Sequence, residues 1–364
     1  MAIVPQAALQ RADVVPNPSM PIKSLDGIRA IAALIVFIAH AGLDHLVPGG
    51  FGVTIFFFLS GYLITTLLRL EYSTHGHIRL TKFYLRRAYR ILPPMYIMLG
   101  IAVALAATEG TMGAVSPGAI LAQLSQMTNY YVIGFGEQHV VPFTSVMWSL
   151  SVEEHFYLLY PLALVVMLPR LDRRRIGQLL LGTCMLVLVW RCFLTFILHV
   201  GSDYSSIATD ARVDSILFGC AMGIAFNPAL ENAIDLGPRI WVVILAFGGG
   251  LLLFSLLYRD SSFRDTFRYT LQGIALFPVF YCAIRYSEWP LFRWLQWRAV
   301  RGLGLISYTF YLAHFKALDV AERLLGTTGL SRACVAFGMT VAVSWLMYVL
   351  VERRFAELRR RLHA

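Results

Sequence analysis

The chain has 364 residues, of which 58% are hydrophobic and only 14% are charged. Soluble domains carry about 25% charged residues, so this composition excludes an ordinary soluble protein and indicates a polytopic membrane protein. The net charge of +10 comes from basic residues spread over separate loops. This spread argues against nucleic-acid binding and favours charges that orient the chain in a membrane.

Apolar segments of membrane-spanning length recur along the chain, so we predict an all-α bundle of about ten transmembrane helices. The predicted spans are 28–46, 51–70, 91–109, 146–168, 176–198, 213–227, 238–257, 269–285, 303–325 and 331–351. Most of the 31 Lys and Arg residues lie between spans on one side, and residues 110–145 contain none. This bias predicts that both termini are cytoplasmic.

Outside the spans, the composition predicts short terminal segments. Residues 1–22 lack an apolar core and are expected to form a flexible cytoplasmic arm rather than a signal peptide. The membrane domain is predicted over 23–355, and a basic cytoplasmic tail over 356–364. The five cysteines lie in apolar segments without CxxC spacing, which favours helix packing over disulfides or metal ligation. No metal site or bound cofactor is predicted.

The first span carries Arg29 and, eleven residues later, His40. Eleven steps of a helix come within about 20° of three full turns, which puts both side chains on one stripe roughly 16 Å apart. Ionisable groups at membrane depth usually line a cavity or a reaction path. Asp44 is one turn beyond His40 and is a candidate to hold its imidazole in one tautomer.

A basic cluster lies between the second and third predicted spans. If this segment is helical, Arg86, Arg87 and Arg90 fall on neighbouring positions. Two explanations remain open: the arginines anchor the chain at the membrane surface, or they bind phosphate groups through bidentate hydrogen bonds.

Charged residues also interrupt later spans. Glu153 and Glu154 are adjacent carboxylates in the fourth span, where a catalytic or substrate-orienting role is favoured over a purely structural ion pair. Arg212 and Asp214 begin the sixth span and diverge on a helix, so each is expected to meet another helix. His314 is the second intramembrane imidazole, and a satisfied bundle residue is the favoured explanation for it.

Together these residues resemble the acyltransferase-3 family of integral-membrane O-acyltransferases. The resemblance runs from about residue 23 to 355. Its motifs are Leu25-Asp-Gly-Ile-Arg29 with His40, Phe56-Phe-Phe-Leu-Ser60-Gly61, Arg86-Arg87-Ala-Tyr-Arg90, Trp148-Ser149-Leu-Ser-Val-Glu153-Glu154, Arg212-Val-Asp214 and Ser307-Tyr308-Thr-Phe-Tyr311-Leu-Ala-His314.

The resemblance implies a multi-pass enzyme of the bacterial inner membrane. Such an enzyme takes an acyl group, commonly acetyl, from acyl-CoA on the cytoplasmic side. It passes this group to a hydroxyl of a carbohydrate or glycoconjugate, such as a surface polysaccharide, lipopolysaccharide or signalling oligosaccharide. The family's functional motifs fall on Arg29 with His40 and on Arg87 with Arg90.

Three positions depart from the family pattern. Ala313 stands where Trp is usual, and Lys316 stands where Pro is frequent. Arg354 stands where the family's C-terminal Glu-x-Pro pattern has its Pro. Many members also carry an extracytoplasmic esterase-like domain, and this chain is expected to be a form without one.

We therefore predict a site in which His40 is the general base and Arg86, Arg87 and Arg90 bind the CoA phosphates. Arg29 stabilises developing negative charge or steers the donor, and Glu153 or Glu154 orients His40 or binds acceptor hydroxyls. The supporting residues are Asp44, Ser149, Arg212, Asp214, Tyr308 and His314. The alternative hypothesis is a transporter of acyl donors or lipid-linked sugars that uses the same buried charges.

Overall fold

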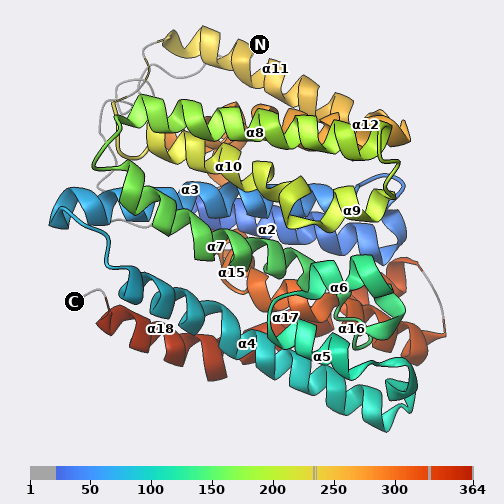
Figure 1. Cartoon of the computed structure of the whole chain (residues 1–364). Coiled ribbons are helices and arrows are strands. Elements are labelled where there is room, and N and C mark those ends of the chain that lie inside the picture. The colour runs from blue at the N-terminus through green and yellow to red at the C-terminus, as the bar shows by residue number, and fades with distance from the viewer. Residues whose placement is uncertain (1–21, 233, 235, 327–328, 363–364) are drawn as a thin grey trace.

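The computed structural model describes residues 22–232, 234, 236–326 and 329–362, and this part of the chain contains helices and no strand. Figure 1 shows long helices lying side by side in a single bundle. The predicted N-terminal arm lies outside the described residues except for residue 22. The all-α fold predicted from hydropathy is confirmed.

Within the described residues, ten helices have 16 or more residues. They are α2 (Lys23–Ile38), α3 (Gly49–His75), α4 (Leu80–Thr108), α7 (Trp148–Met167), α8 (Arg173–Phe196), α10 (Thr209–Ala225), α11 (Gly237–Leu257), α13 (Phe267–Arg285), α16 (Ser307–Leu325) and α17 (Leu330–Met347). The shorter helices are α5 (Pro117–Leu124), α6 (Thr128–Phe135), α9 (Ser202–Ile207), α12 (Ser261–Asp265), α14 (Pro290–Arg293), α15 (Arg298–Leu305) and α18 (Arg353–Arg361).

By length and composition, eight described helices can cross a membrane, rather than the ten predicted. The two others are still helices, at the places where the sixth and ninth spans are predicted. Helix α10 has only 17 residues, and α16 carries Lys316, Asp319, Glu322 and Arg323 in its second half. The chain is thus a polytopic helical membrane protein, with two of its long helices too short or too charged to qualify as spans.

Helix α4 begins eleven residues before the predicted third span. It runs without a break from Leu80 through Pro93 and Pro94 to Thr108. The predicted arginine cluster therefore lies in the first three turns of this helix and not in a separate connection. Because the helix is continuous, the positions of these arginines are fixed relative to its membrane-spanning part.

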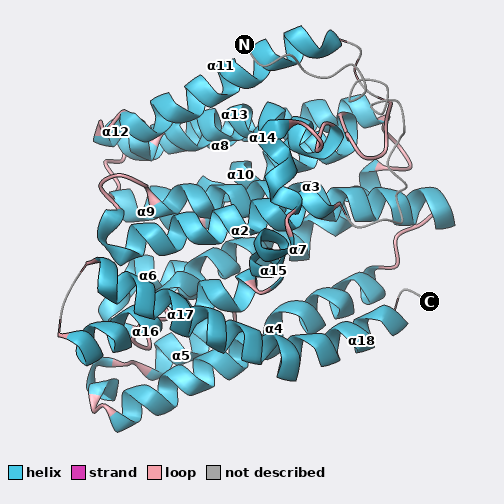
Figure 2. Cartoon of the chain, turned by 180° about the vertical axis from the view of Figure 1, so that it is seen from behind, coloured by secondary structure: helices cyan, strands magenta, loops and turns pink. Residues whose placement is uncertain are grey.

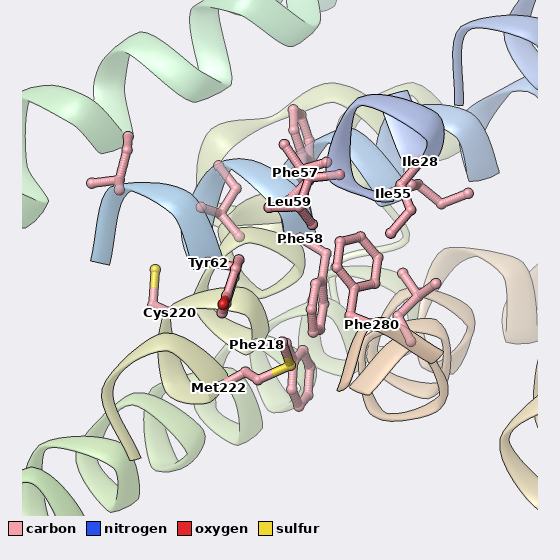
Figure 3. Close-up of a cluster of buried hydrophobic side chains, with 14 of the residues drawn as sticks. Ile28, Ile55, Phe57, Phe58, Leu59, Tyr62, Phe218, Cys220, Met222 and Phe280 are labelled. Carbon is pink, nitrogen blue, oxygen red and sulfur yellow. The ribbon is translucent and has the colours of Figure 1, made fainter. Parts of the chain in front are cut away.

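Glycine allows close contact between α3 and α10 at the centre of the bundle. A Cβ added at Gly219 would lie 1.9 Å from the carbonyl oxygen of Phe58, and one at Gly61 would lie 2.0 Å from that of Ile216. Around this crossing, Phe58 packs on Phe280 of α13 with ring centroids 4.5 Å apart, as Figure 3 shows. Small residues at helix crossings are typical of membrane bundles.

Two of the predicted supporting residues stabilise this bundle. Asp214 accepts a 2.7 Å hydrogen bond from Arg191 of α8, and both side chains are fully buried. Arg212 stacks on the ring of Tyr269, with its guanidinium carbon 3.8 Å from the ring centroid. It also donates to the hydroxyl oxygen of Thr54 at 3.1 Å. Both residues meet partners on other helices, as predicted.

The C-terminal segment is helical over Arg353–Arg361, which includes most of the predicted basic tail. After α17 the chain makes one π-helical turn over Tyr348–Glu352 and continues directly into α18. Figures 1 and 2 show α18 lying beside α4. The predicted boundary between membrane domain and tail, at 355/356, therefore falls inside a helix that packs on the bundle.

Candidate active site

A cavity of about 310 Å³ lies among helices α2, α3, α4, α7 and α16, and residues of α15 and α18 complete its wall. Six of the predicted site residues line it: Arg29, Arg87, Arg90, Ser149, Glu153 and Tyr308. They come from four separate motifs of the sequence, and the fold brings them to one space. Cavities of this size, with a few polar groups in a largely apolar wall, are typical of ligand sites.

Arginines form one wall of this cavity. A second cavity of about 400 Å³ lies next to it, and Arg87, Arg90 and Arg359 line both. Arg86 lines only the second cavity and donates a 2.8 Å hydrogen bond to Glu71. The predicted cluster of Arg86, Arg87 and Arg90 thus lies together at the second cavity, and Arg359 of α18 joins Arg87 and Arg90 in the wall that the two cavities share.

The three arginines of this wall keep their charge available for an anion. Among the described residues, no carboxylate oxygen lies within 4.0 Å of Arg87, Arg90 or Arg359. Arg87 instead lies against the ring of Tyr157, with its guanidinium carbon 5.3 Å from the centroid. Arg29 differs from these three because Asp26 pairs with it at 2.9 Å.

Glu153 is held in the cavity wall by two hydroxyl groups. Ser60 of α3 donates to one carboxylate oxygen at 2.7 Å, and Tyr157 donates to the other at 2.9 Å. Glu154 does not line the cavity, and its Oε1 is buried with no hydrogen-bond partner among the described atoms. The two adjacent glutamates therefore have different surroundings.

Ser149 and Tyr311 connect the cavity wall with the region of the two intramembrane histidines. Both line the cavity, and their hydroxyl oxygens are 2.8 Å apart. The ring of Tyr311 also lies near that of His314, with centroids 5.8 Å apart. Neither His314 nor His40 is among the described residues that line the cavity. Tyr311 is therefore a cavity residue that also lies next to the histidine pair.

His40 and His314 form a hydrogen-bonded pair with a defined direction. The Nδ1 of His314 lies 2.6 Å from the carbonyl oxygen of Tyr311. Because a carbonyl only accepts, this Nδ1 carries the proton, and in a neutral ring the Nε2 of His314 is then an acceptor. The Nδ1 of His40 lies 2.9 Å from that Nε2 and must donate to it. The Nε2 of a neutral His40 is left with a free lone pair.

The free nitrogen of His40 lies beside the start of α3. A Cβ added at Gly49 would lie 3.7 Å from His40 Nε2. The ring of Phe315 covers His40 on another side, with centroids 4.2 Å apart. His40 is therefore held by His314 and Phe315, while its Nε2 faces a position without a side chain.

The predicted partners of His40 are corrected by this geometry. The regular α-helix ends at Ile38, and residues 39–43 form a π-helical turn in which Gly42 has a φ of 109°. The helical i, i+4 relation therefore does not hold for Asp44, which is exposed. Glu153 is engaged by Ser60 and Tyr157 instead of by His40. The hydrogen-bond acceptor for His40 Nδ1 is the Nε2 of His314, in the late motif.

Several residues of the site were not singled out from the sequence. Ser60, Tyr157 and Tyr311 lie within or next to motifs that carry the family resemblance, so position in a motif was an available signal. Glu352 and Arg359 also line the cavity, and Glu352 accepts a 2.6 Å hydrogen bond from Thr309. Both lie in a C-terminal stretch whose basic composition gives no sign of a site.

The chain matches known proteins over most of its length. The family model described as an acyltransferase domain matches residues 22–349. A Staphylococcus aureus protein whose O-acetyltransferase name is provisional is 28% identical over 353 residues, which cover 92% of this chain and 57% of that protein. The peptidoglycan O-acetyltransferase OatA of Listeria monocytogenes is 27% identical, over 91% of this chain and 55% of that protein.

The chain spans about half the length of these curated relatives. No solved structure shows significant similarity to it. The family model covers nearly all of the bundle, including the cavity residues from α2, α4, α7 and α16. This chain is therefore a multi-pass membrane protein that belongs to the acyltransferase-3 family.

Proposed function

We propose that this protein transfers an acetyl group from acetyl-CoA to a hydroxyl of a cell-surface carbohydrate. The names of the relatives support acetyl transfer, and one of them names peptidoglycan as the acceptor. Peptidoglycan, or a glycan of related chemistry, is accordingly the first acceptor to test. The proposed donor and acceptor rest on two supports together, the chemistry of the site and the membership of the family.

In this proposal, the donor enters the cavity from the arginine wall. Guanidinium groups match phosphate oxygens in bidentate geometry, and Arg87 and Arg90 have no carboxylate among the described residues to neutralise them. The acyl-pantetheine arm then extends towards Ser149 and Tyr311 in another part of the cavity wall. Glu153 lines the cavity, as Glu352 does, and can accept hydrogen bonds from the amide groups of the arm.

The histidine pair supplies the base. The acceptor hydroxyl gives its proton to the Nε2 of His40 while its oxygen attacks the thioester carbonyl carbon. The new C–O bond forms, the C–S bond breaks, and the proton passes from the imidazolium to the CoA thiolate. His314 is a positioning residue, because its Nε2 accepts from the Nδ1 of His40 and so leaves the Nε2 of His40 unprotonated.

The observation that carries this proposal is the order of the groups. Cations that can bind phosphate line one wall of the cavity, and Tyr311 in another part of the wall lies next to His314, whose partner His40 has a free Nε2. Acyl transfer from a phosphorylated donor needs these two features at opposite ends of one donor molecule.

Mass spectrometry of surface glycans tests the proposal in cells. Deletion of the gene is expected to remove an acetyl group from one glycan, and the wild-type gene should restore it, whereas the His40→Ala gene should not. An unchanged set of glycan masses in the deletion strain would contradict a carbohydrate acceptor.

Arg87→Ala is expected to weaken CoA binding about 10- to 100-fold, because a hydrogen bond to a charged group contributes about 1.5–3 kcal/mol. Calorimetry on the detergent-solubilised protein measures this. Arg175→Ala is the matched control, because its side chain is 72% exposed and remote from both cavities. Equal affinities for wild type and Arg87→Ala would exclude the arginine wall as the donor site.

A further inference from the structure

Helix α18 forms part of the site although it lies beyond the family match, which ends at residue 349. Glu352, Ala356 and Arg359 follow one another at i, i+4 and i+7 and therefore share one helix face. All three line the main cavity. No proline interrupts residues 330–361, so α17 can continue through the π-helical turn and carry this face to the cavity.

Two contacts hold α18 in this place. Glu352 accepts a 2.6 Å hydrogen bond from Thr309 of α16. Phe355 packs on Tyr89 of α4, with ring centroids 6.0 Å apart. Because these contacts join α18 to both α16 and α4, Arg359 is presented from a fixed helix and not from a loose tail.

The second cavity is strongly basic. Its wall contains five arginines: Arg79, Arg86, Arg87, Arg90 and Arg359. The carboxylate that lines it is Glu71, which pairs with Arg86 at 2.8 Å and with Arg79 at 3.6 Å. Glu71 thus offsets part of the charge of Arg79 and Arg86. The other three arginines keep their charge available for an anionic ligand.

The size of the main cavity indicates that a large donor needs both spaces. A volume of about 310 Å³ is near the lower limit of ligand pockets, which range from about 300 to 1,000 Å³. The second cavity adds about 400 Å³ directly across the arginine wall. A molecule with an uncharged thioester arm and a phosphorylated end matches this pair of spaces in both size and charge.

We propose that the second cavity binds the phosphorylated nucleotide end of the donor and that Arg359 of α18 is one of its phosphate ligands. The ligand class is a phosphorylated adenosine diphosphate group attached to a thioester arm. This inference rests on the proposed function, because it assumes that the arm occupies the main cavity. It adds a binding residue from outside the matched family region.

Competition binding on the purified full-length chain tests this assignment with two probes, CoA and pantetheine, which lacks the nucleotide and its phosphates. Arg359→Ala is expected to weaken CoA binding about tenfold, the loss of one charge-assisted hydrogen bond, and to leave pantetheine binding unchanged. Arg360→Ala is the matched control on the same helix, because its side chain is 76% exposed, and it should bind CoA like the wild type.

The outcomes separate this inference from the proposed function. Wild-type protein that does not bind CoA would contradict both. Equal CoA binding by wild type and Arg359→Ala would overturn only the assignment of Arg359. Loss of pantetheine binding along with CoA binding would also overturn it, since α18 would then act by holding the fold. If Arg359→Ala does not fold, Arg359→Gln, which keeps the length of the side chain more closely, gives the same comparison.

Discussion

His40→Ala is expected to lower the rate of acetyl transfer about 10²- to 10⁴-fold while the protein binds CoA as before. The loss arises because the Nε2 of His40 is the nitrogen left free to take the hydroxyl proton. Donor binding should persist because His40 does not line the cavity that the arginines share. Single-turnover transfer and CoA binding, measured on the same preparation, check both parts.

His45→Ala is the matched control, since His45 is exposed a few residues further along the same connection. It should transfer acetyl groups at the wild-type rate. His314→Ala should retain CoA binding and lose part of the rate, because His40 stays present but no longer donates its Nδ1 proton to His314. A His40→Ala protein with the wild-type rate would rule out the base assignment.

Asp214→Ala is expected to destabilise the protein by about 3–5 kcal/mol, because it leaves the guanidinium of Arg191 as an unpaired buried charge. Arg191 keeps its hydrogen bonds to Thr270 and to the carbonyl oxygen of Ala211, at 2.5 and 2.6 Å, but these groups carry no compensating charge. Thermal unfolding of the detergent-solubilised protein measures the effect.

The double variant Arg191→Met with Asp214→Leu separates the charge effect from packing. Replacing both partners of a buried pair by apolar residues is often neutral or stabilising, so the double variant should be much more stable than Asp214→Ala alone. Asp203→Ala, at an exposed position of α9, should unfold like the wild type. Equal unfolding temperatures for Asp214→Ala and wild type would show that the ion pair does not hold the bundle.

Hydropathy predicts the bundle well because a bilayer leaves few alternatives to apolar helices. The helices appear near the predicted places, including α4, which continues through Pro93 and Pro94. The exceptions are α10 and α16, which are helical but too short or too charged to meet the criteria for a span. Both pack against neighbouring helices, α10 against α3 and α8, and α16 against α17.

The partners of the site residues could not be read from the sequence. Regular helical spacing makes Asp44 a candidate partner of His40, beside Glu153 and Glu154, but beyond Ile38 the chain forms a π-helical turn. The observed partner, His314, is 274 residues away in the chain. Periodicity states which face of a helix a residue occupies, but not which other helix packs there.

The C-terminal arginines illustrate a related difficulty. A basic stretch after the last span usually serves to orient the chain in the membrane. This general explanation gives no reason to expect Arg359 in the site. The spacing of Glu352, Ala356 and Arg359 in the sequence does indicate that they share one helix face. Only the packing of α18 on α4 and α16 gives that face a role.

The most direct test is transfer of labelled acetyl by the purified chain reconstituted in liposomes. Acetyl-CoA labelled in the acetyl group is supplied outside, and peptidoglycan fragments serve as the acceptor. The proposed function predicts label in ester linkage on the glycan, released by mild base, with wild-type protein and not with His40→Ala. Label that accumulates inside the liposomes as intact acetyl-CoA, with none on the glycan, would contradict it and favour a transporter.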